Sequence, residues 1–270
     1  MHQADLRWRR GCLGYRALSW CLYMLAALWL ATIPPARAQG FQALAQRAGV
    51  PVLVPQTGKA ILVNIPAFEL IAFENGTPVL RSRVIVGTPW HRTPRLKTNV
   101  SSVRFRPTWR PTPSMIASGE YPDRIWPPGD RNPLGLVAVR LEQGLLVYLH
   151  DTNRRELFAE EYRALSHGCI RVQRWAELAA FVLGTDLSQV LRDARGTRTF
   201  DAPAPPIPVE LGYYTRFPDA SGQIVTYPDI YNLRAHSDPA QTAVPDRRLA
   251  CLSPPPPVSG AMQLDRDTAQ

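Results

Sequence analysis

The chain has 270 residues, 45% of them hydrophobic, which suits one domain of ordinary size with a sizeable core and additional tails. Its formal net charge is +9, but residues 1–38 hold five arginines against one aspartate, which leaves about +5 for the rest. This modest basic excess suits an anionic cell envelope or plain solubility. The sequence has no zinc-finger spacing, helix-turn-helix cue or basic aromatic stripe, so we expect no nucleic-acid partner.

Residues 1–38 have the pattern of an export signal. Arginines precede an apolar run from about 17 to 33, and Ala-Arg-Ala at 36–38 fits the small-x-small cleavage rule. An uncleaved membrane anchor is the alternative, although the run is short for a span and the preceding Pro34-Pro35 favours cleavage. No later segment is apolar enough to cross a bilayer. We therefore expect an exported protein without a transmembrane segment after cleavage.

Cleavage would remove Cys12 and Cys21 and leave Cys169 and Cys251. Two cysteines can pair in an oxidising compartment. Cys251 lies in a proline-rich stretch, and a catalytic cysteine must remain a thiol. We therefore expect Cys251 to be unpaired or incidental, with a pair between the two cysteines as the alternative.

The first half of the chain after the signal is predicted to be rich in strands. A lead-in at 39–56 is helical or irregular, and Asn75-Gly76 is a strong hairpin signal between strands. The strand from 79 to 86 alternates, so that one of its faces is mostly apolar. The other strands expected here, from their β-branched and apolar content, cover 60–65, 70–73 and 100–105.

Seven prolines interrupt the pattern between Pro107 and Pro133 and argue against regular ladders there. Long loops in compact domains are usually functional or disordered. The interleaved Trp109 and Trp126 favour an ordered loop that covers another part of the molecule.

Two apolar strands are predicted at 136–141 and 145–150, which places His150 at the end of a strand. The connection that follows contains a possible short helix at 157–163. An amphipathic helix is expected from about 174 to 183, with Trp175, Leu178, Ala179 and Val182 on one face, and Gly184 as its C-cap.

The C-terminal part is predicted to begin with a proline-rich linker at 201–208. A further hairpin around Gly222 is expected from the segments 209–217 and 224–227. Residues 235–270 contain four consecutive prolines and many polar residues, which are typical of a disordered tail.

The motif Ser166-His167-Gly168-Cys169-Ile170-Arg171 carries the chemistry. A cysteine with a histidine nearby in the fold can act as a nucleophile, because the histidine takes the thiol proton and the thiolate attacks a carbonyl. Gly168 permits a tight turn, so that amides near the thiol can point at a developing oxyanion. His150 and His167 are both candidates for the base. A zinc site formed by these two histidines and Cys169 is the alternative, although a fourth ligand is missing.

The chain resembles the L,D-transpeptidases of bacterial cell walls, which have the YkuD-type catalytic domain. Those proteins carry a histidine, a spacer of roughly fifteen residues and Ser/Thr-His-Gly-Cys, which His150 and the motif at 166–169 reproduce. Arg171 is similar to the Gram-negative branch, and the segments 63–70 and 83–87 extend the resemblance. It runs roughly from 57 to 184 and more weakly to 233.

The resemblance implies a mainly β fold with a few helices, a YkuD-like β-sandwich. It implies a catalytic domain at 57–234, with a core at 57–185 and a strand pair at 207–230. It assigns the nucleophile to Cys169 and the base to His150, whose ring the Asp151 carbonyl would orient. His167 and Gly168 would shape the site and its oxyanion pocket.

Other residues near the motif have less specific roles. Arg171 is a candidate for clamping a substrate carboxylate. Ser166 is expected to hydrogen-bond within its loop. Trp109 and Tyr148 are expected mainly to pack, and both are also candidates for lining the substrate cleft. Similar chains carry a much larger insertion, which forms a lid, in place of the segment 107–133.

The implied activity is a periplasmic peptidoglycan L,D-transpeptidase that needs no metal or cofactor. Its partners would be peptidoglycan stem peptides, with a cell-wall partner protein as a further possibility. Cys169 would attack the carbonyl of the third stem residue, diaminopimelate, expel terminal D-alanine and form 3→3 cross-links. The alternatives are hydrolysis of the same thioester by an L,D-carboxypeptidase or endopeptidase, attachment of a lipoprotein to the wall, and a non-catalytic wall-binding module.

Overall fold

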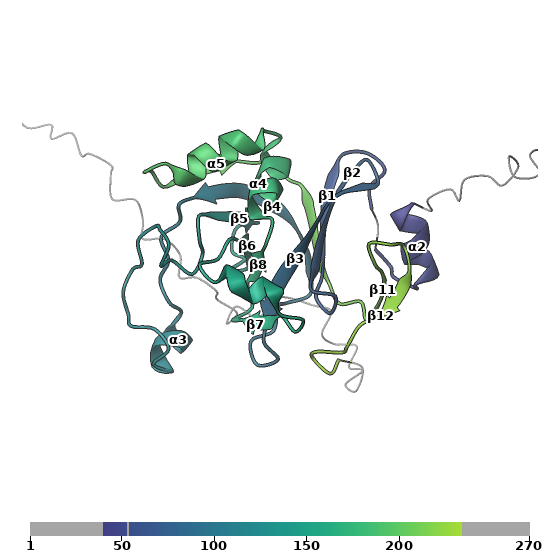
Figure 1. Ribbon diagram of the computed structural model, residues 1–270, viewed down its shortest axis with the longest axis horizontal. Coiled ribbons are helices and arrows are strands. Elements are labelled where there is room, and N and C mark those ends of the chain that lie inside the picture. Colours follow the sequence, from purple (N-terminus) through teal and green to yellow (C-terminus); the bar gives the residue numbers. More distant parts are fainter. Residues whose placement is uncertain (1–39, 53, 234–270) are drawn as a thin grey trace, which may run out of the picture. The chain divides into compact units, whose positions relative to one another are not determined.

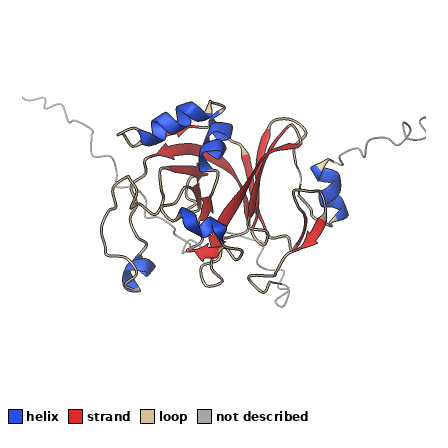
Figure 2. Cartoon of the chain, in the orientation of Figure 1, coloured by secondary structure: helices blue, strands red, loops and turns tan. Residues whose placement is uncertain are grey.

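The computed structural model describes residues 40–52 and 54–233, so the predicted signal at 1–38 and the predicted tail at 235–270 lie outside the described residues. Residues 1–40 separate from a unit that begins at Phe41, and this unit contains all the elements named here. Most of these elements are strands, which confirms the predicted mainly β class (Figures 1 and 2). In chain order they are α2 (Phe41–Arg47), β1 (Lys59–Asn64), β2 (Glu69–Glu74), β3 (Thr77–Gly87), β4 (Leu96–Phe105), α3 (Pro113–Ala117), β5 (Val137–Leu141), β6 (Tyr148–His150), the 3₁₀ helix η1 (Arg155–Ala159), β7 (Ala164–Ser166), β8 (Ile170–Val172), α4 (Trp175–Leu183), α5 (Leu187–Arg195), β9 (Phe200–Pro203), β10 (Pro208–Gly212), β11 (Arg216–Pro218) and β12 (Ile224–Thr226).

A ten-stranded sheet forms the centre of the unit. Along its main path the strands follow the order β10-β1-β2-β3-β8-β6-β5-β4-β9, and β7 pairs with β3. Strand β10 runs parallel to β1 and also pairs antiparallel with β4. The sheet therefore closes on itself through β10, which protects the edges that an open sheet would expose.

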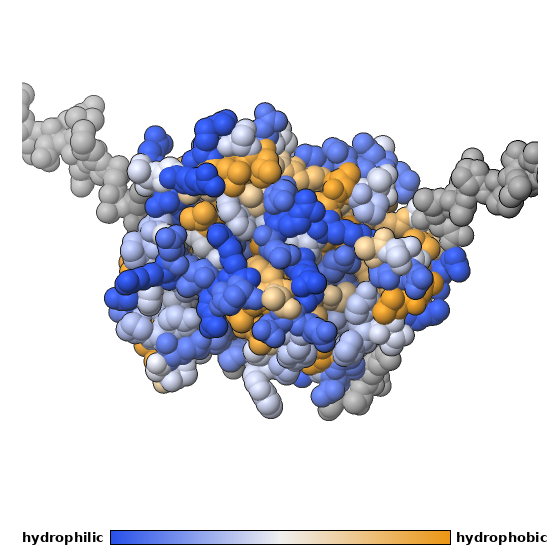
Figure 3. Space-filling model, in the orientation of Figure 1, coloured by the Kyte–Doolittle hydropathy of each residue, from blue (hydrophilic) through white to orange (hydrophobic). Residues whose placement is uncertain are grey.

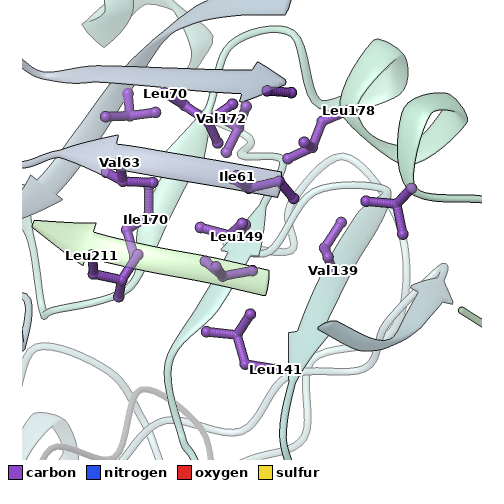
Figure 4. Packing of buried hydrophobic residues seen from close by; sticks show 14 of the residues in the cluster. Ile61, Val63, Leu70, Val139, Leu141, Leu149, Ile170, Val172, Leu178 and Leu211 are labelled. Atoms are coloured by element: carbon purple, nitrogen blue, oxygen red, sulfur yellow. The ribbon is translucent and has the colours of Figure 1, made fainter. Parts of the chain in front are cut away.

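The apolar side chains enclosed by this closed sheet form the main core. Figure 4 shows how residues from strands far apart in sequence meet there, among them Ile61, Leu149, Ile170 and Leu211. Leu178 of α4 joins the same cluster, so the helix lies against the strands as its amphipathic pattern predicted. Burying each such side chain contributes about 1.5–3 kcal/mol to stability, so the core holds the short strands around the site in register.

Strands β1 to β3 form an antiparallel meander, in which the predicted hairpin joins β2 and β3. Asn75 and Gly76 both have positive φ, at 50° and 78°, as a tight hairpin turn of the primed type requires. In β3, Leu80, Ser82 and Val84 are buried, which confirms the alternation. Helix α4 ends at Gly184 with φ at 64°, the left-handed C-cap expected there.

The predicted linker at 201–208 is wrong, because Phe200–Pro203 forms β9 and Pro208 begins β10. Proline is tolerated at both places for a positional reason. Strand β9 is at the edge of the sheet, where a missing N–H breaks no ladder, and Pro208 is the first residue of its strand. The predicted single hairpin at 209–227 is instead two separate features. Strand β10 joins the main sheet, and β11 and β12 pair with each other.

The segment 107–133 is ordered, as its tryptophans indicated, but it contains more regular structure than its prolines suggested. Helix α3 begins at Pro113, and the side chain of Thr112 caps it by accepting a hydrogen bond from Met115 N at 3.3 Å. Trp109 and Trp126 form an antiparallel β-bridge through two backbone hydrogen bonds of 3.0 and 2.6 Å. Figure 1 shows α3 within the long segment that connects β4 and β5.

The elements around the motif are shorter than predicted. Strand β6 covers only Tyr148–His150, and the helix expected at 157–163 is the 3₁₀ turn Arg155–Ala159. The chain after this turn must be extended for β7, and the buried Arg163 donates to the carbonyls of Val84 and Phe68 there. The motif begins at the last residue of β7 and ends within β8, two three-residue strands that were not predicted.

Helix α2 packs outside the closed sheet, beside β11 and β12 (Figure 1). Phe41 contacts Phe73 and Phe217 with ring centroids 4.8 and 5.6 Å apart, so the predicted lead-in is held by a second apolar cluster. The face drawn in Figure 3 is largely hydrophilic, and its apolar side chains lie in separate small patches.

Candidate active site

Strand pairing brings His150 and Cys169 to the same place. Strands β6 and β8 are parallel neighbours, with Leu149 opposite Ile170 and His150 opposite Arg171. Cys169 immediately precedes β8, so the register places its backbone beside Tyr148 at the start of β6, two residues before His150. Both side chains are buried, at 5% exposure each, and both line one small pocket. Two residues nineteen positions apart are therefore brought into one pocket, His150 from the last position of a strand and Cys169 from the turn that leads into the neighbouring strand.

The Ser166–Cys169 turn is closed by its own hydrogen bonds. The Ser166 hydroxyl donates to Cys169 O at 2.6 Å and accepts from Gly168 N at 3.1 Å, so the predicted loop role of Ser166 is present. Gly168 has φ at 110°, a conformation that L side chains rarely adopt. The Gly168 N–H is therefore used within the turn itself.

The sulfur of Cys169 is in a disulfide in the structure, contrary to the expectation of a free thiol. Every other cysteine of the chain, Cys251 included, lies outside the described residues. The sulfur also lies 3.7 Å from the carbonyl oxygen of Leu146, where the backbone has left the β6 ladder. Thiol chemistry at this position therefore requires prior reduction.

The His150 ring is oriented by the backbone. Its Nδ1 donates to the carbonyl oxygen of Asp151, the contact that the family resemblance implied, and this makes Nε2 the unprotonated nitrogen of the neutral ring. Burial, together with the nearby Arg171 cation, lowers the pKa of His150 to about 3, although carbonyls of Asp151 and Leu134 oppose the shift. The ring is therefore neutral at physiological pH and able to accept a proton.

The contacts of the Asp151 side chain hold in place the residue whose carbonyl orients His150. Its buried carboxylate accepts from Leu136 N at 2.9 Å and forms an ion pair with Arg155 at 2.7 Å. Gly135 approaches so closely that a Cβ there would lie 2.3 Å from the carboxylate. The backbone carbonyl that orients His150 therefore belongs to a residue fixed on both sides.

The pocket is a narrow space of about 40 Å³ covered by the segment 107–133. Trp109, Met115 and Tyr121 of that segment line it opposite the motif. Tyr121 lies edge-on to Trp109 with centroids 4.8 Å apart, and Arg124 stacks 4.2 Å above the Trp126 ring. The full lining is Trp109, Met115, Tyr121, Pro133, Leu134, His150, Ser166, His167, Cys169 and Arg171.

His167 lies at the rim of the pocket rather than against the core. Its Nε2 is 2.9 Å from Glu120 Oε2, and its ring contacts the His91 ring at a centroid distance of 4.6 Å. Burial is the main cause that lowers the pKa of His167, while Glu120 acts in the opposite direction. At neutral pH the link to Glu120 is therefore a hydrogen bond from a neutral imidazole.

Arg171 lies in the pocket beside His150. Burial lowers the pKa of its guanidinium, and the Tyr121 hydroxyl and the carboxylates of Glu120 and Glu156 raise it. Among the described residues, no hydrogen bond or ion pair to this guanidinium is present. Its donors are therefore available for a ligand carboxylate.

Tyr148, a candidate for lining the substrate cleft, is not among the residues that line the pocket. It is buried in the aromatic layer with Trp109 and Leu134, and that burial raises the pKa of its hydroxyl. The expectation that it mainly packs describes it better. Trp109 both packs in this layer and lines the pocket.

Sequence reasoning missed a set of hydrogen bonds that holds the motif turn. Thr93 Oγ1 donates to Gly168 O at 2.8 Å and accepts from Gly87 N at 2.8 Å. The Tyr231 hydroxyl donates to Gly87 O at 2.7 Å and accepts from Thr93 N at 3.2 Å. Three of these four contacts join residues 75 to 144 positions apart, and no local pattern in the sequence signals them.

The arrangement of the described residues bears on the zinc alternative and on whether a later segment spans a membrane. In the part of the chain that the structure describes, no group of three or more His, Cys, Asp or Glu side chains is placed to hold a metal ion, so His150, His167 and Cys169 do not form the zinc site considered above. No helix within residues 40–52 and 54–233 is long and apolar enough to cross a membrane.

A mainly β domain with a cysteine and a neutral histidine in one buried pocket has the equipment of a thiol-dependent acyl-transfer site. The model of the YkuD L,D-transpeptidase catalytic domain matches residues 58–209, which is more than half of the chain. The chain therefore belongs to the YkuD L,D-transpeptidase family.

Two curated relatives agree with this assignment. The chain is 30% identical over 233 residues to a Haemophilus influenzae protein named "Putative L,D-transpeptidase", covering 70% of this chain and 47% of that protein. It is 32% identical over 129 residues to "Probable L,D-transpeptidase YbiS" of Escherichia coli strain K12, covering 45% and 40%. The chain thus spans less than half the length of these relatives.

Solved structures of L,D-transpeptidases are more distant. One from Mycobacterium smegmatis is 15% identical with a TM-score of 0.39, covering 57% of this chain and 58% of that one. Another, from Stackebrandtia nassauensis, is 14% identical with a TM-score of 0.35, covering 67% and 72%.

Proposed function

We propose that this protein is a cysteine L,D-transpeptidase that acts on peptidoglycan. The observation that carries the proposal is the placement of Cys169 and His150 in one pocket, with the ring neutral and tied to the Asp151 carbonyl. Family membership supports transpeptidation as the reaction class. The active form is the one in which the disulfide at Cys169 has been reduced.

The first half-reaction forms a thioester. His150 Nε2 takes the thiol proton, and the Cys169 thiolate attacks the carbonyl carbon of the third stem residue, diaminopimelate. The bond from that carbonyl to the terminal D-alanine nitrogen breaks. The leaving amine receives the proton from His150, so D-alanine departs and the acyl group remains on sulfur.

The second half-reaction transfers the acyl group. The side-chain amine of diaminopimelate on a neighbouring stem gives a proton to His150 and attacks the thioester carbonyl. The carbon–sulfur bond breaks, and a 3→3 cross-link forms. The sulfur leaves as a thiolate, which the proton from His150 returns to the thiol. Arg171, whose donors are available, is proposed to bind a carboxylate of the donor stem.

The proposed location is the periplasm. This part of the proposal rests on the sequence of residues 1–38, with its arginines, apolar run and Ala-Arg-Ala cleavage pattern.

The test is to incubate the reduced full chain with purified cell-wall sacculi, digest the wall and identify the products by mass. The proposal expects 3→3 cross-linked products, none with Cys169→Ala, and a loss on the order of a hundredfold with His150→Ala. Tripeptide alone would indicate a hydrolase, and attachment of a lysine-bearing protein would indicate an anchoring enzyme. Unchanged activity in folded Cys169→Ala would overturn the assignment.

A further inference from the structure

Glu120 links the covering segment 107–133 to the motif turn. Its Oε2 lies 2.9 Å from Nε2 of His167, two residues before Cys169. Both side chains are partly shielded, with 42% of Glu120 and 27% of His167 exposed. The two residues are 47 positions apart, so this contact forms only when the segment lies over the pocket.

The segment behaves as one piece because its two arms are joined to each other. Trp109 and Trp126 are bridged through their backbones, and Tyr121 packs edge-on against both rings. The Asn132 amide donates to the carbonyls of Pro107 and Pro127 at 2.8 and 3.1 Å, which closes the base of the segment. A contact at Glu120 is therefore transmitted to Trp109, which lines the pocket.

His167 is held from its other side by a second loop. The His91 ring lies against it, and His91 N donates to the carbonyl and hydroxyl oxygens of Thr88, both at 3.1 Å. Thr88 N in turn donates to Ser166 O at 2.9 Å, which ties this loop to the motif. The His167 imidazole therefore lies between the His91 ring on one side and the carboxylate of Glu120 on the other.

We propose that Glu120 is a positioning residue that holds the segment 107–133 closed over Cys169 through His167. The inference rests on the proposed function, because the thioester it protects belongs to that reaction. With the segment closed, Trp109, Met115 and Tyr121 exclude water from the sulfur. The acyl group then waits for an amine acceptor, and fewer turnovers end in hydrolysis.

The test compares Glu120→Ala and Glu120→Gln with Asp123→Ala in the reduced full chain. Asp123 is a matched control because it lies in the same segment and forms an ion pair with Arg110, both about half exposed, without touching the motif. Glutamine keeps an oxygen that can accept from His167 Nε2, so Glu120→Gln should retain most of the effect of the native residue.

The first measurement is hydrogen exchange of residues 107–133, followed by mass spectrometry without substrate. Glu120→Ala should raise exchange there by about two- to fivefold, the range expected for one partly exposed polar pair. Asp123→Ala and Glu120→Gln should stay near wild type. Equal exchange in wild type and Glu120→Ala would show that Glu120 does not hold the segment 107–133 closed. That conclusion would stand whether or not the protein is a transpeptidase.

The second measurement is the ratio of cross-linked product to hydrolysed tripeptide on a soluble tetrapeptide stem. Glu120→Ala should lower this ratio by a similar factor of about two to five while D-alanine release continues. A residue with a merely structural role would reduce both products together and leave the ratio unchanged, which would also overturn the inference. Absence of both products in wild type would instead count against the proposed function.

Discussion

The buried His150 predicts a specific loss of stability in acid. Its folded-state pKa is about 3, whereas the ordinary value is 6.5. Below pH 6.5 the unfolded chain therefore binds a proton that the folded chain does not. Stability is fully present above pH 6.5 and falls as the pH drops towards the folded pKa.

The magnitude follows from the separation of the two values. Each pH unit below 6.5 costs about 1.4 kcal/mol, so at pH 4.5 this ring alone destabilises the fold by about 2.7 kcal/mol relative to pH 7.5. His150→Asn removes the titrating group and keeps a donor for the Asp151 carbonyl. Carboxylates titrate in both proteins, so their contribution cancels in the difference between the two.

The assay is equilibrium urea unfolding of both proteins at pH 7.5 and 4.5 under reducing conditions. Wild type should lose about 2.7 kcal/mol more than His150→Asn over that interval. His91→Asn is the control for removing a histidine as such, because His91 is not buried, does not line the Cys169 pocket and leaves His150 in place. Parallel losses in wild type and His150→Asn would show that the ring is not held neutral by burial, and the argument for it as a ready base would fail.

Two further predictions concern the pocket. Arg171→Ala should raise KM for a soluble tetrapeptide by about ten- to a hundredfold, because a charge-assisted hydrogen bond to a carboxylate is lost. Arg171→Lys should recover part of this loss. An unchanged KM in Arg171→Ala would contradict the proposed binding of a substrate carboxylate by Arg171. Because the Cys169 sulfur is in a disulfide, a carbapenem-type β-lactam should add to the protein only after reduction, as one adduct absent from Cys169→Ala. Intact-protein mass spectrometry measures this, and an equal adduct without reductant would refute it.

Much of the fold follows from local patterns in the sequence. The alternation in β3, the Asn75-Gly76 turn and the amphipathic α4 each depend on neighbouring residues, so each was predictable. Strands β7 and β8 were not, because three residues are too few for a periodicity to be recognised. Strand β9 was missed because its proline reads as a linker until its edge position is known.

In the candidate site, too, some residues are signalled by a local motif and others depend on contacts between distant segments. Cys169 and His150 were found because a linked motif spans them, and the parallel pairing of β6 and β8 then explains their proximity. Thr93, Glu120 and Tyr231 carry no motif, and their contacts with the turn depend on how distant loops fold together. The disulfide at Cys169 is one of the two alternatives that the sequence leaves open, because cysteines of an exported protein can pair in an oxidising compartment.

The charge of Arg171 connects substrate binding to the base. Its proximity to His150 helps to lower the pKa of the ring, which keeps the imidazole neutral but also makes it a weaker proton acceptor. In the proposed reaction, a donor carboxylate bound to Arg171 would offset that positive charge at close range. The pKa of His150 would then rise while substrate is bound, and the ring would become a stronger base at the time when the thiol must lose its proton. In the empty pocket, the charge of Arg171 opposes proton uptake by the buried His150. Once a carboxylate is bound to Arg171, that opposition is reduced and the arrangement favours catalysis.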